Sequence, residues 1–257
     1  ASEVRRVEFG APDGIPVVGD FNGDGTDEVA IYNEGDWFVD INGNGRWDQD
    51  DLYAQLGTSQ DRPVTGDWDG DGKDDIGIYG PMWPRDPVAI ETDPGLPDPD
   101  NRRMRDPKNV PPGMAEATDG ARTLKLTADG LERQDLIDHV FAYGDPVDVP
   151  IAGDWNGDGI RTIGVFHSGT WRLDLDGDGR WTRADGEFEF GDKGDVPVIG
   201  DWNGDGIEEI GVFRAGTWIL DTNGNREIDA TDRVFEMGET GDRPITGDWD
   251  GDGIDDP

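Results

Sequence analysis

Short apolar runs alternate along this chain with stretches of Asp, Asn and Gly. In one section the apolar runs cover 197–200, 210–213, 216–220 and 233–237, and they are rich in β-branched and aromatic residues. No window shows a sustained helical period. The pattern therefore predicts an all-β protein built from short strands, four of them in each structural unit.

The same pattern recurs as an internal repeat, in which Pro-Val-x-Gly-Asp-Trp-Asn-Gly-Asp-Gly precedes an apolar strand and a Gly-x-Trp strand. The five copies begin at Pro16, Pro63, Pro150, Pro197 and Pro244. Three of the four steps between them are 47 residues. Four short strands every 47 residues are typical of a β-propeller blade. We therefore expect a β-propeller of four-stranded blades, although an open stack of repeats would fit the same pattern.

The two ends of the chain match parts of one further blade. Residues 5–10 resemble a fourth strand, and residues 244–257 supply a first strand and its loop. The prediction is thus a single repeat domain over 1–257, with four full repeats and a partial blade from the two termini. Since that blade lacks its middle strands, we also expect the chain to belong to a longer multidomain protein.

One step is 87 residues, which is 40 more than the others, so the second repeat carries an insertion at 81–120. This segment holds 9 of the 17 prolines, a composition that favours an extended excursion over packed strands. It also contains a short basic run, Arg102, Arg103, Arg105 and Lys108. The run is either a solvated loop that docks on acidic neighbours or an arm that binds a partner.

A nine-residue loop, Asp-x-[Asn/Asp]-Gly-Asp-Gly-x-x-[Asp/Glu], follows the first strand of every repeat. Oxygen ligands are offered by the side chains at positions 1, 3, 5 and 9 and by the carbonyl at position 7. A Gly turn directs these oxygens toward one point, as in an EF-hand calcium loop. The third copy is weakened, because position 9 is Thr162 and Arg161 stands beside it. The candidate ligands are Asp20, Asn22, Asp24, Thr26 and Glu28; Asp67, Asp69, Asp71, Lys73 and Asp75; Asp154, Asn156, Asp158 and Ile160; Asp201, Asn203, Asp205, Ile207 and Glu209; and Asp248, Asp250, Asp252, Ile254 and Asp256.

A twelve-residue loop connects the third and fourth strands of three repeats and carries an acid at position 12. The second repeat has Thr127 and Leu131 at ligand positions, so we expect no metal there. In the last copy Arg226 replaces the Gly of position 6, where the turn prefers a positive φ. The candidate ligands are Asp40, Asn42, Asn44, Arg46 and Asp51; Asp174, Asp176, Asp178, Arg180 and Asp185; and Asp221, Asn223, Asn225 and Asp232.

The charge of the chain fits metal binding. Lys and Arg number 22 and Asp and Glu 59, which gives a formal charge of −37. Eight divalent ions would add 16 positive charges and leave −21. Oxygen ligands without His or Cys favour Ca²⁺ over Zn²⁺ or Cu²⁺. Metal-free Asp/Asn/Gly turns are the alternative.

Several other classes of function are disfavoured. The chain has no basic face for nucleic acid, no apolar run long enough to cross a membrane and no Cys. Neither of its two His residues belongs to a repeated or convergent arrangement with Ser or Cys that would indicate a nucleophile triad, so no catalytic residue is assigned. The ten Trp residues most simply fill the core between blades. Trp47 and Trp181 lie inside twelve-residue loops and are candidates for stacking against a carbohydrate.

The nine-residue loops, with the strands 76–79 and 163–166 that follow two of them, resemble the FG-GAP repeats of integrin α-subunit propellers and the related VCBS repeats of bacterial surface proteins. The resemblance covers nearly the whole chain outside the insertion, but not the twelve-residue loops, which are closer to dockerin loops. It implies a calcium-loaded propeller outside the cell or at its surface, with a role in adhesion or scaffolding. We expect a non-catalytic module that binds a protein or a glycan; a calcium-dependent lectin is the alternative, and a polysaccharide-active enzyme is a weaker one.

Overall fold

The computed structural model describes residues 9–10, 13–48, 50–68, 70–80, 122–123, 143–145, 147–177, 179 and 181–257. All regular structure in these residues is β, as predicted, and no helix among them could cross a membrane. The insertion at 81–120, the segment around Thr127 and the ligand candidates Asp69, Asp178 and Arg180 lie outside the described residues.

The strands follow the repeats, and their bounds agree with the predicted runs to within one or two residues. They are β1 Ile15–Gly19, β2 Glu28–Asn33, β3 Asp36–Val39, β4 Leu52–Gln55, β5 Arg62–Gly66, β6 Asp75–Tyr79, β7 Arg122–Thr123, β8 Val149–Gly153, β9 Thr162–His167, β10 Thr170–Leu173, β11 Gly186–Glu189, β12 Val196–Gly200, β13 Glu209–Arg214, β14 Thr217–Leu220 and β15 Arg233–Glu236.

These strands form four sheets in which neighbours along the chain pair antiparallel. The sheet orders are β1-β2-β3-β4-β7, β5-β6, β8-β9-β10-β11 and β12-β13-β14-β15, and only the short β7 pairs parallel, with β4. The hairpins between second and third strands turn at two residues with positive φ, such as Ala215 and Gly216. Such turns match the right-handed twist of the strands that they join.

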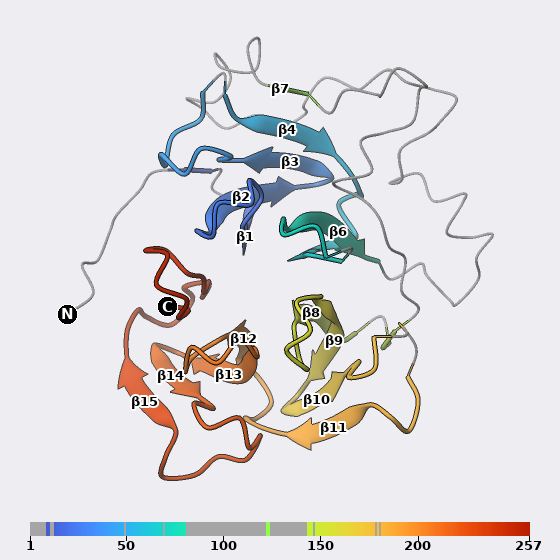
Figure 1. Ribbon diagram of the computed structural model, residues 1–257, viewed down its shortest axis with the longest axis vertical. Helices are drawn as coiled ribbons and strands as arrows, with labels where there is room; N and C mark the ends of the chain where they lie inside the picture. The colour runs from blue at the N-terminus through green and yellow to red at the C-terminus, as the bar shows by residue number, and fades with distance from the viewer. Residues whose placement is uncertain are drawn as a thin grey trace.

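The four sheets surround a common centre, and the first strands lie nearest to it (Figure 1). β1 packs beside β5, β5 beside β8, and β8 beside β12. The C-terminal segment lies between the last sheet and the first (Figure 1). Within this segment Gly247 and Asp256 form an isolated antiparallel bridge.

A repeated hydrogen bond links the nine-residue loops into a closed circle. In every repeat the backbone N–H of position 8 donates to the carbonyl of the position 1 Asp in the preceding repeat, at 2.9–3.0 Å. Asp27 of the first repeat donates in the same way to Asp248 of the fifth. The guanidinium of Arg243 also donates to the carbonyl of Gly14, at 2.7 Å. The end of the chain is therefore joined to its beginning.

Aromatic residues at fixed places in the repeat build the core. Trp37, Trp171 and Trp218 on the third strands are at most 3% exposed. Each meets an aromatic ring of the second strand edge-on, and each donates its indole N–H to a carbonyl 19 residues later. Because the indole N–H has a hydrogen-bond acceptor, the large ring is buried without leaving an unsatisfied donor in the core. This repeated contact explains the Gly-x-Trp element of the sequence.

Candidate metal centres

The nine-residue loops fold around their first aspartate. The carboxylate of Asp20 accepts the backbone N–H groups of Gly23, Asp24 and Gly25 at 2.7–3.0 Å. The first aspartates of the other four loops, Asp67, Asp154, Asp201 and Asp248, accept the equivalent three groups. The position 5 carboxylate then accepts the N–H of position 7. One backbone geometry therefore serves all five loops.

Among the described residues, three nine-residue loops bring carboxylates close enough together to hold a metal ion. In each loop, one oxygen from every acid of a trio lies within 4.8 Å of the others. Asp20, Asp24 and Glu28 form the trio of the first repeat, Asp201, Asp205 and Glu209 that of the fourth, and Asp248, Asp250 and Asp252 that of the fifth. In the first and fourth repeats the position 3 amide donates to the position 9 Glu at 2.6 Å, so Asn22 and Asn203 also lie in the cluster.

The other two nine-residue loops differ. The second has Asp67, Asp71, Lys73 and a buried Asp75 in place, while its Asp69 is outside the described residues. In the third loop the hydroxyl of Thr162 at position 9 donates to the carbonyl of Asp174, at 2.7 Å. Thr162 therefore supports the twelve-residue loop of the same repeat, while Asp154, Asn156 and Asp158 keep the loop geometry.

The twelve-residue loops place their first aspartates, Asp40, Asp174 and Asp221, in the interior, at most 3% exposed. At the far end of each loop the position 12 carboxylate accepts the N–H of position 9, at 2.5 Å for Asp51 and for Asp185 and 2.8 Å for Asp232. In the third repeat Asp174, Asp176 and Asp185 form a trio like those of the nine-residue loops.

Buried carboxylate oxygens without a hydrogen-bond partner stand in the other two twelve-residue loops. Among the described residues these are Oδ1 of Asp51 in the first repeat and Oδ1 of Asp221 and of Asp232 in the fourth. Asp51 and Asp221 are fully buried. A buried acceptor that is left unsatisfied is costly, so these atoms fit a cation. Arg226 adopts a φ of +63°, in agreement with the strain that the sequence predicts at this position.

Two acids that the candidate ligands did not include lie in the same loops. Asp48 and Asp229 occupy position 9, and each accepts the side-chain amide of the position 5 Asn at 2.9 Å, from Asn44 and Asn225. Position 9 is a ligand position in loops of this length, often through a water, so the spacing itself was a signal for them.

Burial and crowding hold protons on several of these acids. Burial first, and then the carboxylates of Asp20 and Asp24, raise the pKa of Glu28 to about 8. Burial likewise raises the pKa of Glu209 to about 8 and that of Asp51 to about 7, with nearby carboxylates adding to the effect. Burial and neighbouring carboxylates thus favour the protonated form of these acids, and a bound cation would favour their ionised form.

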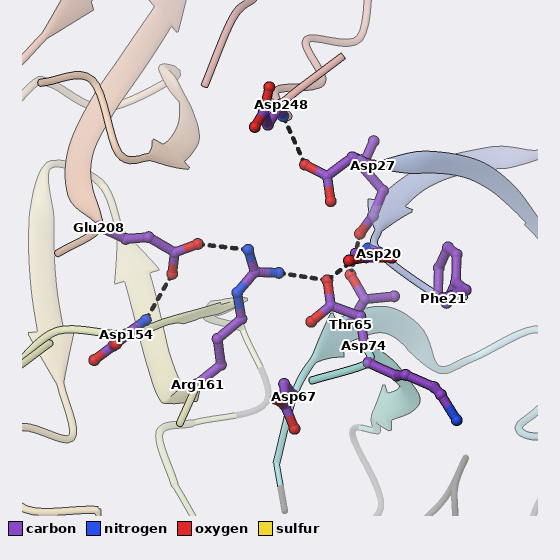
Figure 2. Close-up of polar contacts among 12 residues, drawn as sticks. Asp20, Phe21, Asp27, Thr65, Asp67, Asp74, Asp154, Arg161, Glu208 and Asp248 are labelled. Carbon is purple, nitrogen blue, oxygen red and sulfur yellow. Dashed lines mark hydrogen bonds and ion pairs between the residues drawn. The ribbon is translucent and has the colours of Figure 1, made fainter. Parts of the chain in front are cut away.

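The residues at position 8 meet at the centre of the ring. Arg161 lies between Asp74 and Glu208, at 2.6 and 2.7 Å (Figure 2). Asp27 and Asp255 face the same space, and burial raises the pKa of Asp27 to about 6 and that of Asp255 to about 7. Burial disfavours the charged form of Arg161, but the carboxylates of Asp74 and Glu208 outweigh it and raise its pKa. Sequence reasoning placed Arg161 beside the third loop and missed this cluster.

The four position 8 acids also hold the neighbouring loops. Each accepts the backbone N–H of a position 1 aspartate, at 2.6–3.1 Å, from the loop that precedes it around the ring. An arginine cannot accept such a bond, so the N–H of Asp67 donates no bond of this kind to the position 8 side chain of the third repeat, and between Asp67 and Arg161 the backbone bond remains. A pocket of about 240 Å³ opens beside that step and is lined by Asp20, Asp67, Gly72, Lys73, Asp74, Asp154, Gly159 and Arg161.

The two candidate stacking residues have different surroundings. Trp47 is partly buried and packs against Phe38 and Phe9, with ring centroids 5.3 and 6.4 Å apart. Trp181 packs edge-on against Tyr143 but remains 43% exposed. Trp181 therefore has a free surface for a ligand, whereas Trp47 contributes to the core.

No protein-family model and no curated protein matches this chain. The assignment of its function therefore depends on the geometry of its own loops.

Proposed function

We propose that this protein is a non-catalytic, calcium-binding β-propeller module that acts as a scaffold or adhesion unit of a secreted or surface protein. The observation that carries the proposal is the set of four carboxylate trios among the described residues, three in nine-residue loops and one in a twelve-residue loop. In an antiparallel meander the loops after the first and third strands emerge at the same end, so all these loops share one face.

The closed circle of loops supports a propeller. Every step around the centre uses the same backbone hydrogen bond, and the step from the fifth repeat to the first is no different. The N-terminal residues support a fifth blade formed by both ends of the chain. A Cβ on Gly10 would touch Ile31, as one on Gly57 would touch Ile78 and one on Gly191 would touch Val212. Gly10 thus occupies the place of a fourth-strand end.

The ligand chemistry supports calcium as the ion. The trios offer carboxylates, and the chain has no Cys and only two His. Ca²⁺ accepts six to eight oxygens in flexible geometry, whereas Mg²⁺ requires a near-ideal octahedron and keeps much of its water. A loop with acids at alternating positions, a carbonyl and a Gly turn matches the calcium preference. The resemblance to FG-GAP and VCBS repeats agrees with a place outside the cell.

Thermal unfolding with and without calcium tests this proposal. One ion held at a hundred times its dissociation constant adds about 2.7 kcal/mol to the stability of the folded state. For a protein of this size each kcal/mol raises the Tm by about 2–4 °C. Several ions should therefore raise the Tm by about 10 °C or more over the value in EGTA, and Mg²⁺ at the same concentration should raise it less. An unchanged Tm would exclude a calcium-stabilised module.

A further inference from the structure

The nine-residue and twelve-residue loops of one repeat lie against each other. In the first repeat the amide of Asn22 donates to the carbonyl of Ile41, at 3.1 Å. A Cβ placed on Gly43 would lie 3.8 Å from Oε1 of Glu28. In the fourth repeat the equivalent distance, from a Cβ placed on Gly224 to Oε1 of Glu209, is 3.6 Å. The position 9 side chain of one loop therefore lies beside position 4 of the other.

The third repeat makes the same contact with a different residue. The hydroxyl of Thr162 donates to the carbonyl of Asp174, and its methyl carbon would lie 3.5 Å from a Cβ on Gly177. Position 9 is thus the junction of the two loops in all three repeats, whether it is Glu28, Thr162 or Glu209. In the fourth repeat the junction is also electrostatic, because the charges of Asp221 and Glu209 repel each other.

The number of acids at ligand positions is the same in these three repeats, although their distribution differs. Each pair of loops carries six, counted at positions 1, 3, 5 and 9 of the shorter loop and 1, 3, 5, 9 and 12 of the longer. The sets are Asp20, Asp24, Glu28, Asp40, Asp48 and Asp51; Asp154, Asp158, Asp174, Asp176, Asp178 and Asp185; and Asp201, Asp205, Glu209, Asp221, Asp229 and Asp232.

The distribution shifts at the junction. The third repeat has Thr162 in place of a glutamate. Its twelve-residue loop has Asp176 and Asp178 in place of the Asn residues at positions 3 and 5 of the other two, and Thr182 in place of the Asp at position 9. The carboxylate trio moves with the charge, from the nine-residue loop of the first and fourth repeats to the twelve-residue loop of the third. Loops that acted independently would have no reason to keep a common total.

A separate observation points to a ligand in the twelve-residue loops of the first and fourth repeats. Asp51 and Asp221 are fully buried, and each has a carboxylate oxygen without a hydrogen-bond partner among the described residues. Asp51 and Asp221 belong to twelve-residue loops that lie against a nine-residue loop. Within the part of the chain that the structure describes, neither of these two loops has a carboxylate trio like that of Asp174, Asp176 and Asp185. An ion in these loops would satisfy the two oxygens.

We propose that the two loops of the first, third and fourth repeats form one paired site for two divalent cations, with position 9 of the nine-residue loop as the shared junction. Each pair of loops offers six acids at its ligand positions to two ions of charge +2, so the pair tolerates a carboxylate on either side of the junction but requires the total of six. This inference rests on the proposed calcium binding. It adds that the ions bind to a pair of loops, and not to each loop separately.

An exchange of residues in the fourth repeat tests the pairing in the full chain. The variants are Glu209→Thr, Asn223→Asp and the double variant, which copies the third repeat at both positions. Calcium binding is measured by isothermal titration calorimetry, as the number of ions bound and their affinities. Glu209→Thr should weaken both ions of this repeat at least tenfold. The double variant should recover most of that loss, because the total of six is restored.

The controls separate the outcomes. Glu239→Gln removes one exposed charge outside both loops and should leave the titration unchanged. Circular dichroism and the Tm in EGTA show that each variant is folded. The paired site is wrong if the double variant's change in calcium affinity is the product of the two single changes. It is also wrong if Glu209→Thr weakens one ion alone. In both cases the proposed calcium binding still stands. A wild-type protein that binds no calcium would overturn the proposed function and this inference together.

Discussion

The third and fourth repeats have the same backbone and different chemistry. β9 pairs with β10 and β13 with β14 in one register, with Trp171 opposite Phe166 and Trp218 opposite Phe213. Both nine-residue loops satisfy three N–H groups with their first aspartate. The comparison teaches that the loop folds in the same way whether position 9 is Thr162 or Glu209.

The remaining loop positions decide which loop holds a carboxylate trio. Glu209 completes the trio of the nine-residue loop in the fourth repeat, and Asp176 completes that of the twelve-residue loop in the third. Position 8 also differs, since Arg161 of the third repeat pairs with Glu208 of the fourth. Each repeat therefore needs the other at the centre of the ring, even though their loops carry different ligands.

The largest expected effect comes from breaking the central pair. Arg161→Met leaves Asp74 and Glu208 without their cation, and the Asp74 side chain is only 5% exposed. Removing one partner of a buried ion pair costs about 3–5 kcal/mol. We expect a loss of that size in the free energy of unfolding, measured by urea denaturation in EGTA.

Arg172→Met is the matched control for that variant. Arg172 pairs with Glu187, and the two side chains are 36% and 53% exposed. Exposed pairs contribute less than about 1 kcal/mol, so this variant should remain close to the wild-type stability. Equal losses of unfolding free energy in the two variants would show that the central ion pairs of Arg161 contribute no more stability than an exposed pair.

The next effect separates the two nine-residue loops. Asp201→Ala and Asp154→Ala remove the same three backbone hydrogen bonds, but Asp201 belongs to a trio and Asp154 does not. In saturating calcium both variants weaken a paired site, but Asp201→Ala also breaks a carboxylate trio. It should therefore lower the stability further, by up to about the 2–3 kcal/mol of one lost ion. Calorimetric Tm values measure the difference. It should disappear in EGTA, and a difference that persists there would mean that it does not arise from metal.

The smallest effect is a pH dependence at position 9 of the nine-residue loops, which Glu209 of the fourth repeat should show and Thr162 of the third should not. The pKa of Glu209 is raised from 4.5 to about 8 in the folded state, so the folded protein holds a proton that the unfolded chain has lost. Stability without metal is then highest below about pH 4.5 for this group and falls as the pH rises toward 8. Glu209→Gln should flatten the fall between pH 5 and 8 in EGTA. An unchanged slope would contradict the raised pKa.

Calcium should reverse that slope in the wild-type protein. The ion requires the ionised carboxylate, so its affinity rises as Glu209 loses its proton. Thr162 does not titrate, so the nine-residue loop of the third repeat contributes nothing at this position. The pH profile with calcium, compared with that in EGTA, therefore reports on the fourth repeat and, through Glu28, on the first.

The sequence by itself determined the local structure. The 47-residue spacing, the apolar runs and the Gly-x-Trp elements predicted the strands, because strand formation and burial follow from alternation and residue type. The acid clusters of the nine-residue loops followed as well, since Asp20, Asp24 and Glu28 are neighbours along the chain. Even the strain at Arg226 could be predicted, because a positive φ depends on the turn around one residue.

Only the tertiary structure decided which repeats meet and through which side chains. Arg161 stands next to Thr162 in the chain, yet it points to the centre and joins Asp74 to Glu208 across three repeats. Likewise Thr162 reaches Asp174 only because β9 and β10 pair antiparallel in a fixed register. The physical reason is distance along the chain: contacts within a loop are set by local geometry, whereas contacts between repeats arise when the sheets close around a common centre.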